Sequence, residues 1–187
     1  LSTQTATRMI KEAQGAGLPV TADVAVHQLH LTEMDVDGFF AECHVSPPFR
    51  TLADREALRL EESDGTISSN CSDHQTHEPD AKQRPFPETE PGISGLETLL
   101  GLTLRLDEEQ VHDLPTALAR VTSAPADIQG LPCGRLVLGS PADVCVFDPN
   151  RDWTLDLDKM HSEGRNTPFA GWDFPARVTH TLFNGRV

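Results

Sequence analysis

The opening stretch 1–26 places a helix signal directly before a strand signal, and this order constrains the fold more than any other feature. Apolar residues recur at i, i+3, i+4 and i+7 over 6–13, behind a cap at Ser2 or Thr3, which predicts an amphipathic helix. A short Gly-Leu-Pro link then leads into the alternating stretch 20–26, which predicts a strand. A helix joined so closely to a strand is typical of α/β proteins.

The same order returns further along the chain. Thr51 with Asp54 forms a capping signal for a helix that we expect to reach about residue 62. A short strand is predicted over 66–72, and it ends immediately before Asp73. Two helix-plus-strand units in succession favour a parallel sheet covered by helices.

A long loop and two more helices complete the front part of the chain. The stretch 78–91 is polar and proline-rich, and loops of this length in compact domains are usually functional or disordered. Ser94 with Glu97 predicts the capped start of an apolar helix running to about residue 106. A further helix is expected over 114–123, capped by Asp113.

Beyond residue 130 the pattern changes to short apolar runs separated by turn residues. Strands are predicted over 142–147, 153–155 and 177–183. We therefore expect two parts, an α/β segment 1–130 and an all-β segment 131–187. A complete (β/α)8 barrel takes about 250 residues, so a barrel could be present only in part, as its last strands. Both ends of the sequence read as cuts rather than as natural termini.

The charge of the chain limits its partners. The formal net charge is -14 and the basic residues are scattered, so phosphate backbones and anionic membrane surfaces would be repelled. No apolar run approaches the ~20 residues of a membrane span. A small anionic substrate remains compatible with this charge, because a local arginine or metal ion can reverse the local field.

The cysteines match neither a zinc cluster nor a disulfide framework, which suits a reducing cytosol. They are Cys43, Cys71, Cys133 and Cys145. Cys71 and Cys145 lie in apolar runs, so we expect both to be small core residues.

The most informative polar group is the run that follows the second predicted strand. Asp73 stands where the strand ends, with His74 and His77 close behind. In barrel enzymes this rim carries the catalytic groups, and a carboxylate there can bind a metal ion and accept a proton from water. The residues alone equally allow a solvated, turn-forming aspartate with two loop histidines.

Two further groups each allow two interpretations. His27 and His30 could share a metal ion, or could be structural imidazoles hydrogen-bonded near the barrel rim. The glycines of 90–97 could expose backbone N–H groups to an anion, or could form a turn before an N-cap at Ser94.

Five segments resemble motifs of the dihydroorotase family, in order along nearly the whole chain. They are 18–24 with His27 (family P-V-T-A-E-V-x-P-H-H), 46–50 with 54–58 (N-P-P-L-R…D-R-E-A-L), 64–67 with 72–77 (D-G-T-I…T-D-H-A-P-H), 92–98 (G-I-x-G-L-E-T) and 166–171 (N-T-P-F-x-G). Taken together these matches are highly specific.

The resemblance implies the C-terminal part of a zinc-dependent (β/α)8 amidohydrolase barrel plus part of a small β-sandwich. It implies a cytoplasmic, oligomeric enzyme that interconverts N-carbamoyl-L-aspartate and dihydroorotate in pyrimidine synthesis. By resemblance, Asp73 is the last metal ligand and the general base, and His77 binds the substrate carboxylate. Pro91 and Gly92 fall on the backbone that contacts the substrate ring.

The departures from the family pattern keep other functions open. The remaining metal ligands of the family would precede Leu1, and a catalytic zinc normally needs at least three protein ligands, so the chain alone should be inactive. Ser46 replaces a substrate-binding asparagine, and Gln28 replaces the second histidine of its motif. Both changes resemble non-catalytic dihydroorotase-like chains that assemble bacterial aspartate carbamoyltransferase. A hydantoinase or an allantoinase is a third alternative.

Overall fold

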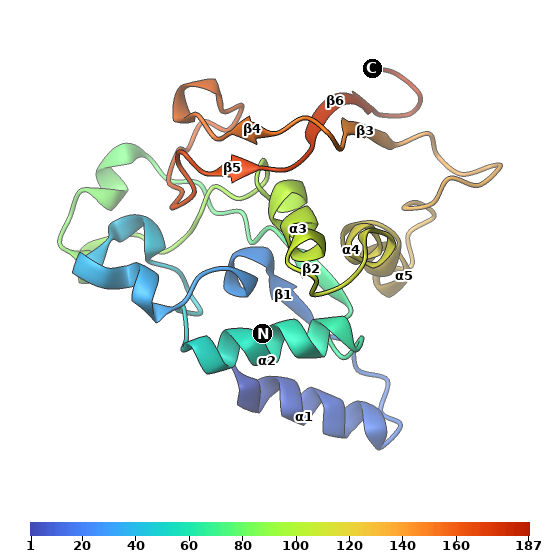
Figure 1. Cartoon of the computed structure of the whole chain (residues 1–187), viewed down its shortest axis with the longest axis horizontal. Helices are drawn as coiled ribbons and strands as arrows, with labels where there is room; N and C mark the ends of the chain where they lie inside the picture. The colour runs from blue at the N-terminus through green and yellow to red at the C-terminus, as the bar shows by residue number, and fades with distance from the viewer.

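The computed structural model describes residues 1–187, and its first half repeats a helix-plus-strand unit. Helix α1 (Gln4–Gly15) precedes strand β1 (Asp23–Ala25), and helix α2 (Leu52–Ser63) precedes strand β2 (Ser69–Cys71). Figure 1 shows α1 and α2 side by side on one side of the two strands. The Thr3 side chain caps α1, which confirms the predicted helix start.

The two strands pair in parallel, with Val24 opposite Asn70. This pairing confirms the predicted α/β arrangement. Both strands are shorter than the predicted stretches 20–26 and 66–72, because neighbouring backbone groups are used elsewhere. The chain turns into the 3-10 helix η1 (Val26–Leu29) directly after β1, and Ile67 donates its N–H to the carbonyl of Glu61 before β2 begins.

The segment between the two units and the long loop after β2 are built of short 3-10 turns. These are η2 (Glu33–Phe39) and η3 (Ala41–Cys43) in the first segment, and η4 (Pro79–Lys82) and η5 (Phe86–Glu88) in the second. The predicted loop 78–91 is therefore confirmed as a region without long elements.

Helices α3 (Leu99–Glu108), α4 (Leu114–Val121) and α5 (Ser123–Gln129) follow. The predicted start of α3 at Ser94 is wrong. The Ser94 hydroxyl donates to the carbonyl of Gly164, and Glu97 accepts N–H groups from His161 and Ser162. Both side chains thus contact the segment 131–187, called the tail below, and do not form a capping box.

The tail consists of two antiparallel ladders. Strand β3 (Val144–Asp148) pairs with β6 (Arg177–Leu182), and β4 (Trp153–Thr154) pairs with β5 (Asp173–Phe174), with the turn η6 (Leu157–Lys159) between. Strands β3, β4 and β6 confirm the three predicted strands, whereas β5 was not predicted. In Figure 1 the ladders lie on the side of α3 opposite to α1 and α2.

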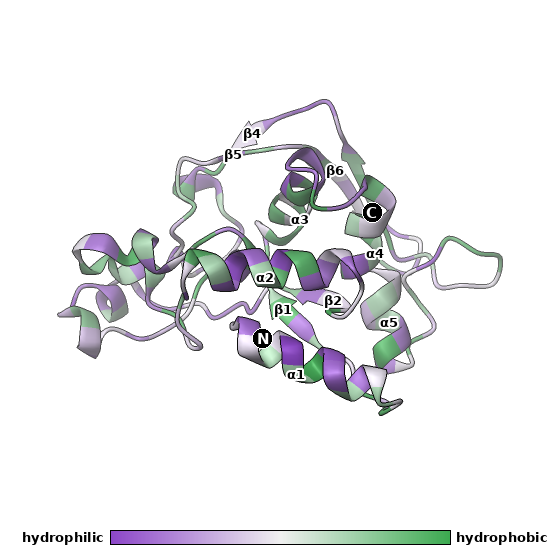
Figure 2. Ribbon diagram, turned by 60° about the horizontal axis from the view of Figure 1, so that its bottom comes forward, coloured by the Kyte–Doolittle hydropathy of each residue, from purple (hydrophilic) through white to green (hydrophobic).

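The largest apolar core joins the front part to the tail. Val26 and Leu102 pack in one cluster with Leu155, Phe169 and Phe174. A second cluster, which includes Val24, Leu58, Ile67 and Leu106, packs α2 and α3 against the parallel strands. Figure 2 shows hydrophilic and hydrophobic segments alternating along α1 and α2, as expected of helices with one buried face. The assignment of 131–187 to a separate β-sandwich domain stays a prediction.

The expectation that Cys145 is a core residue is wrong. Its side chain is exposed on β3, and Cys71 is only half-buried, whereas Cys43 is the buried cysteine. All four thiols are free. No helix combines the length and the apolar character needed to cross a bilayer.

Candidate active site

Asp73 lies two residues beyond the carboxyl end of β2. Its backbone has a φ of 45°, in the left-handed region that non-glycine residues rarely adopt. The side chain is half-buried, and its carboxylate accepts one long hydrogen bond of 3.3 Å, from Nε2 of Gln75. The carboxylate therefore retains acceptor positions for a further ligand.

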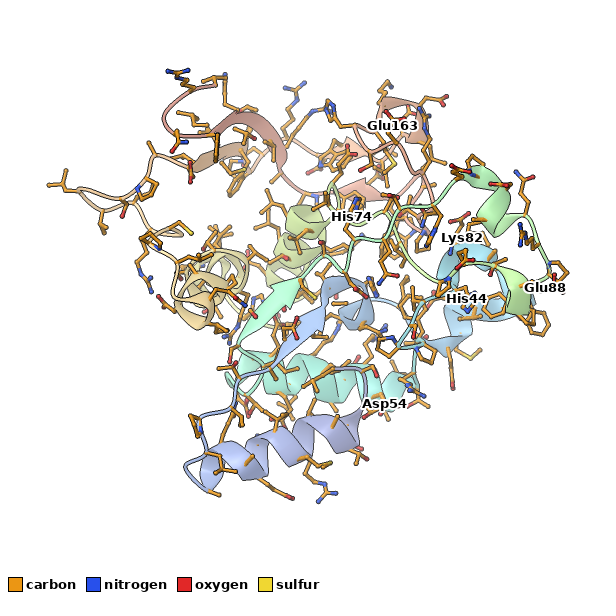
Figure 3. All side chains as sticks on the ribbon, turned by 180° about the vertical axis from the view of Figure 1, so that it is seen from behind. His44, Asp54, His74, Lys82, Glu88 and Glu163 are labelled. Atoms are coloured by element: carbon orange, nitrogen blue, oxygen red, sulfur yellow. The ribbon has the colours of Figure 1, made fainter.

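His74 is committed to the backbone of the next loop. Its Nδ1 accepts the N–H groups of Gly95 and Leu96, at 3.1 and 3.3 Å. Figure 3 shows His74 close to the end of β2. Because Nδ1 accepts, the proton of the neutral ring resides on Nε2. His74 thus holds two loops together, and its Nδ1 is not free to bind a metal ion.

His77, Pro91 and Gly92, the three residues expected from the resemblance to bind substrate, lie close together in the structure. Nε2 of His77 lies 2.9 Å from the carbonyl oxygen of Pro91, and since a carbonyl only accepts, Nε2 is the donor. Gly92 has a φ of 141°, and a Cβ there would lie 2.6 Å from the Cβ of Gln75. Only glycine fits at this point of contact between the two loops.

Two other glycines allow the tail and the α3 loop to approach the segment 72–77. A Cβ at Gly95 would lie 2.6 Å from the carbonyl oxygen of Ser72, and one at Gly164 would lie 2.6 Å from the Cβ of Thr76. The backbones of the α3 loop and of the tail therefore both pack directly against the segment that carries Asp73 and His77.

Asn166, the first residue of the 166–171 motif, was not among the predicted site residues. Its side chain is buried and hydrogen-bonds to the backbone of Gln75, His77 and Gly92. These partners are 74 to 91 residues distant in sequence. No local pattern could have identified them.

The loop before α3 is held from the opposite side by η3 and η4. The carbonyl of His44 accepts the N–H of Gly92 at 2.8 Å and lies 3.4 Å from Nζ of Lys82. Figure 3 shows His44 and Lys82 on neighbouring segments. Burial lowers the pKa of the Lys82 ammonium, although the nearby Glu42 carboxylate acts in the opposite direction. The backbone N–H groups of Gly92, Gly95 and Leu96 are all used inside the protein, so the anion-binding interpretation of 90–97 is not supported.

His27 and His30 are structural, not metal ligands. His27 packs edge-on against Phe49 with ring centroids 5.6 Å apart, and burial lowers its pKa to about 4. Nε2 of His30 hydrogen-bonds to the carbonyl of Leu102, and burial together with Arg59 lowers its pKa to about 3. The prediction of hydrogen-bonded imidazoles is correct for His30, whereas Nε2 of His27 has no partner.

The residues of this chain do not form a metal site by themselves. No group of three or more histidine, cysteine, aspartate or glutamate side chains is arranged to hold an ion. A catalytic zinc normally has at least three protein ligands. Asp73, with its under-used carboxylate, could supply one of them.

Comparison with known proteins gives the chain its family. The Amidohydrolase family profile matches residues 3–187. The chain is 48% identical over 179 residues to a dihydroorotase-like protein of Pseudomonas aeruginosa, covering 96% of the chain and 42% of that protein. It is 44% identical over 187 residues to a dihydroorotase of Syntrophotalea carbinolica, covering 100% of the chain and 44% of that protein. The chain thus spans less than half the length of these relatives.

Solved structures support the same fold. An L-hydantoinase (dihydropyrimidinase) from Arthrobacter aurescens superposes with a TM-score of 0.93 at 25% identity, covering all of this chain and 43% of that one. A dihydropyrimidinase from Brevibacillus agri superposes with a TM-score of 0.91 at 22% identity, covering all of this chain and 42% of that one. The arrangement of helices and strands is therefore part of the amidohydrolase (β/α)8 fold, and the chain belongs to the amidohydrolase family.

Proposed function

We propose that the chain is part of a longer, cytoplasmic dihydroorotase that interconverts N-carbamoyl-L-aspartate and dihydroorotate in pyrimidine synthesis. One observation carries the proposal: a carboxylate with a single weak hydrogen bond stands just beyond a parallel strand, at the rim where barrel enzymes place their chemistry. The name of the relative from Syntrophotalea carbinolica, a dihydroorotase, supports the substrate.

In this proposal Asp73 moves the proton. Its carboxylate accepts a proton from water as the water oxygen attacks the cyclic amide carbonyl. The protonated carboxyl then donates to the amide nitrogen as the C–N bond breaks, so the residue returns to its initial state. We propose Asp73 also as one ligand of a zinc ion whose other ligands lie outside this chain.

His77 is proposed to hold the carboxylate of the substrate. Its Nε2 already donates to the carbonyl of Pro91, so only Nδ1 is left for a ligand. Nδ1 donates to a carboxylate only when it too carries a proton, that is, when the ring is cationic. The adjacent Pro91–Gly92 backbone is proposed to contact the substrate ring.

A non-catalytic dihydroorotase-like subunit is the second candidate. The relative from Pseudomonas aeruginosa is named a dihydroorotase-like protein. Gln28, which departs from the family pattern, is buried and donates to the carbonyl of Pro47, so it serves packing rather than substrate. Such a subunit would assemble with aspartate carbamoyltransferase as an oligomer.

The test compares Asp73→Asn with wild type in the complete protein. We expect dihydroorotate hydrolysis to fall by about 10²–10⁴-fold, the usual contribution of a positioned general base. Asp80→Asn, on the exposed turn η4, is the matched control and should retain the wild-type rate. Equal rates for Asp73→Asn and wild type would refute the catalytic role. An inactive wild type that co-purifies with aspartate carbamoyltransferase would favour the second candidate.

A further inference from the structure

We propose that Asn166, contributed by the tail, is a positioning residue of the candidate active site. Its side-chain amide joins the segment that carries Asp73 and His77 to the segment that carries Pro91 and Gly92. The catalytic consequence rests on the proposed function, whereas the positioning itself rests on geometry alone.

The oxygen of the Asn166 amide contacts both segments. Oδ1 accepts the backbone N–H of His77 at 2.9 Å and lies 2.8 Å from the hydroxyl of Ser94. The N–H of His77 belongs to the residue whose ring contacts Pro91. The amide oxygen therefore fixes the backbone from which that ring extends.

The nitrogen of the same amide also contacts both segments. Nδ2 donates to the carbonyls of Gln75 and Gly92, at 2.9 and 3.0 Å. Gln75 is the residue whose side chain hydrogen-bonds Asp73. One planar group thus determines the distance between two loops, because both protons of its nitrogen and its oxygen are engaged at once.

The environment of Asn166 leaves little freedom for substitution. The residue is 4% exposed, and its own backbone carbonyl accepts the N–H of Ser94. A Cβ at Gly164 would lie 3.1 Å from Oδ1, so the tail backbone packs directly on the amide. A longer glutamine side chain would not fit the same four partners.

Aspartate is the informative replacement because it keeps the shape and reverses the chemistry. In its ionised form an Asn166→Asp side chain has no donor, so a carboxylate oxygen would face the carbonyl oxygens of Gln75 and Gly92. These two contacts become repulsive, while those to His77 and Ser94 are retained. The variant should therefore separate the two loops without leaving a cavity.

The experiment measures dihydroorotate hydrolysis and amide hydrogen exchange in the complete protein. For Asn166→Asp we expect kcat/KM to fall about 10–100-fold with a raised KM, because small displacements of positioning groups have effects of this size. A merely structural lesion would lower the active fraction and leave KM unchanged. Asn150→Asp, at an exposed turn, is the matched control and should behave as wild type.

Hydrogen exchange separates failure of the inference from failure of the proposed function. Faster exchange confined to 73–77 and 91–95 supports the positioning role even if the wild type does not hydrolyse dihydroorotate. Ser94→Ala, a milder change at the same junction, should accelerate exchange in the same segments to a smaller extent. If Asn166→Asp unfolds the protein, Ser94→Ala decides the question. Unchanged KM and unchanged local exchange in the folded variants would overturn the inference.

Discussion

Asp73 combines an unfavourable backbone conformation with an under-used carboxylate. A non-glycine residue in the left-handed region costs on the order of 1–3 kcal/mol and persists only where its surroundings determine it. Here His74 binds the Gly95 and Leu96 backbone on one side, and Asn166 binds Gln75 and His77 on the other. Strain held in this way is typical of pre-organised sites, which supports the proposed role of Asp73.

The close approach at Gly95 gives a prediction for a single residue. In Gly95→Ala the new Cβ would lie 2.6 Å from the carbonyl oxygen of Ser72, a backbone atom that cannot rotate away. We expect the free energy of unfolding to fall by about 1–3 kcal/mol, the usual cost of overpacking. Urea denaturation of the complete protein measures this change.

Gly15→Ala is the control for that prediction. Gly15 closes α1, and nothing lies within 4 Å of a Cβ placed there. Alanine should leave stability unchanged or raise it by about 0.4–1 kcal/mol, because it reduces the entropy of the unfolded chain. Equal destabilisation by both substitutions would show that contact with Ser72 is not the cause.

At the scale of elements, the sequence correctly predicted the helix starts that depend on contacts between near neighbours in the chain. The caps at Thr3, Thr51 and Asp113 were readable from sequence because each side chain binds a backbone N–H only three residues away. Ser94 and Glu97 show the same pattern but bind partners 64 to 72 residues distant. The start of α3 was therefore predicted wrongly, because both side chains of the expected capping box bind distant residues instead of the start of the helix.

The contact between α4 and α2 gives a prediction for an element. Arg120 on α4 donates to the backbone carbonyls of Glu62 and Ser68, at 2.7 and 3.3 Å. It lies beside a buried cluster in which Glu62 binds Asn70 and His112. Arg120→Met would remove both of these hydrogen bonds, so we expect a loss of about 1–3 kcal/mol in urea denaturation.

Arg135→Met, the same substitution at an arginine outside α4, is the matched control for Arg120→Met. Arg135 pairs with Asp127 at the protein surface, where water replaces lost hydrogen bonds. It should change stability little. If Arg135→Met lowered the free energy of unfolding as much as Arg120→Met does, the hydrogen bonds of Arg120 to Glu62 and Ser68 would not be the cause of the loss.

At the scale of the whole molecule, the tail and the barrel segment act as one structure. The sequence predicted the α/β order, the parallel strand pair and the β character of the tail, all of which follow from periodicity. It did not predict that Phe169 and Phe174 would share a core with Val26, or that Asn166 would reach Gln75 and Gly92. These contacts depend on how the chain returns in space, which no local pattern encodes.

Two buried histidines beside this core, which contact Phe49 and Leu102, make the stability of the molecule depend on pH. His27 and His30 are buried in neutral form, and burial lowers their pKa values to about 4 and about 3, from 6.5. As pH falls below about 6.5, the unfolded chain binds protons that the folded chain does not. The free energy of unfolding therefore falls with falling pH. The loss caused by each histidine is complete once the pH reaches the pKa of that histidine in the folded protein.

His27→Leu tests this coupling. The fully developed shift at His27 corresponds to about 3 kcal/mol. Between pH 7 and 5, where carboxylates stay largely ionised, the variant should show a flatter dependence of unfolding free energy on pH than wild type. At pH 8 it should lose little stability, because Nε2 of His27 has no hydrogen-bond partner to lose. His161→Gln, at an exposed position, should keep the wild-type slope. If His27→Leu also keeps that slope, the buried imidazole is not the source of the pH dependence.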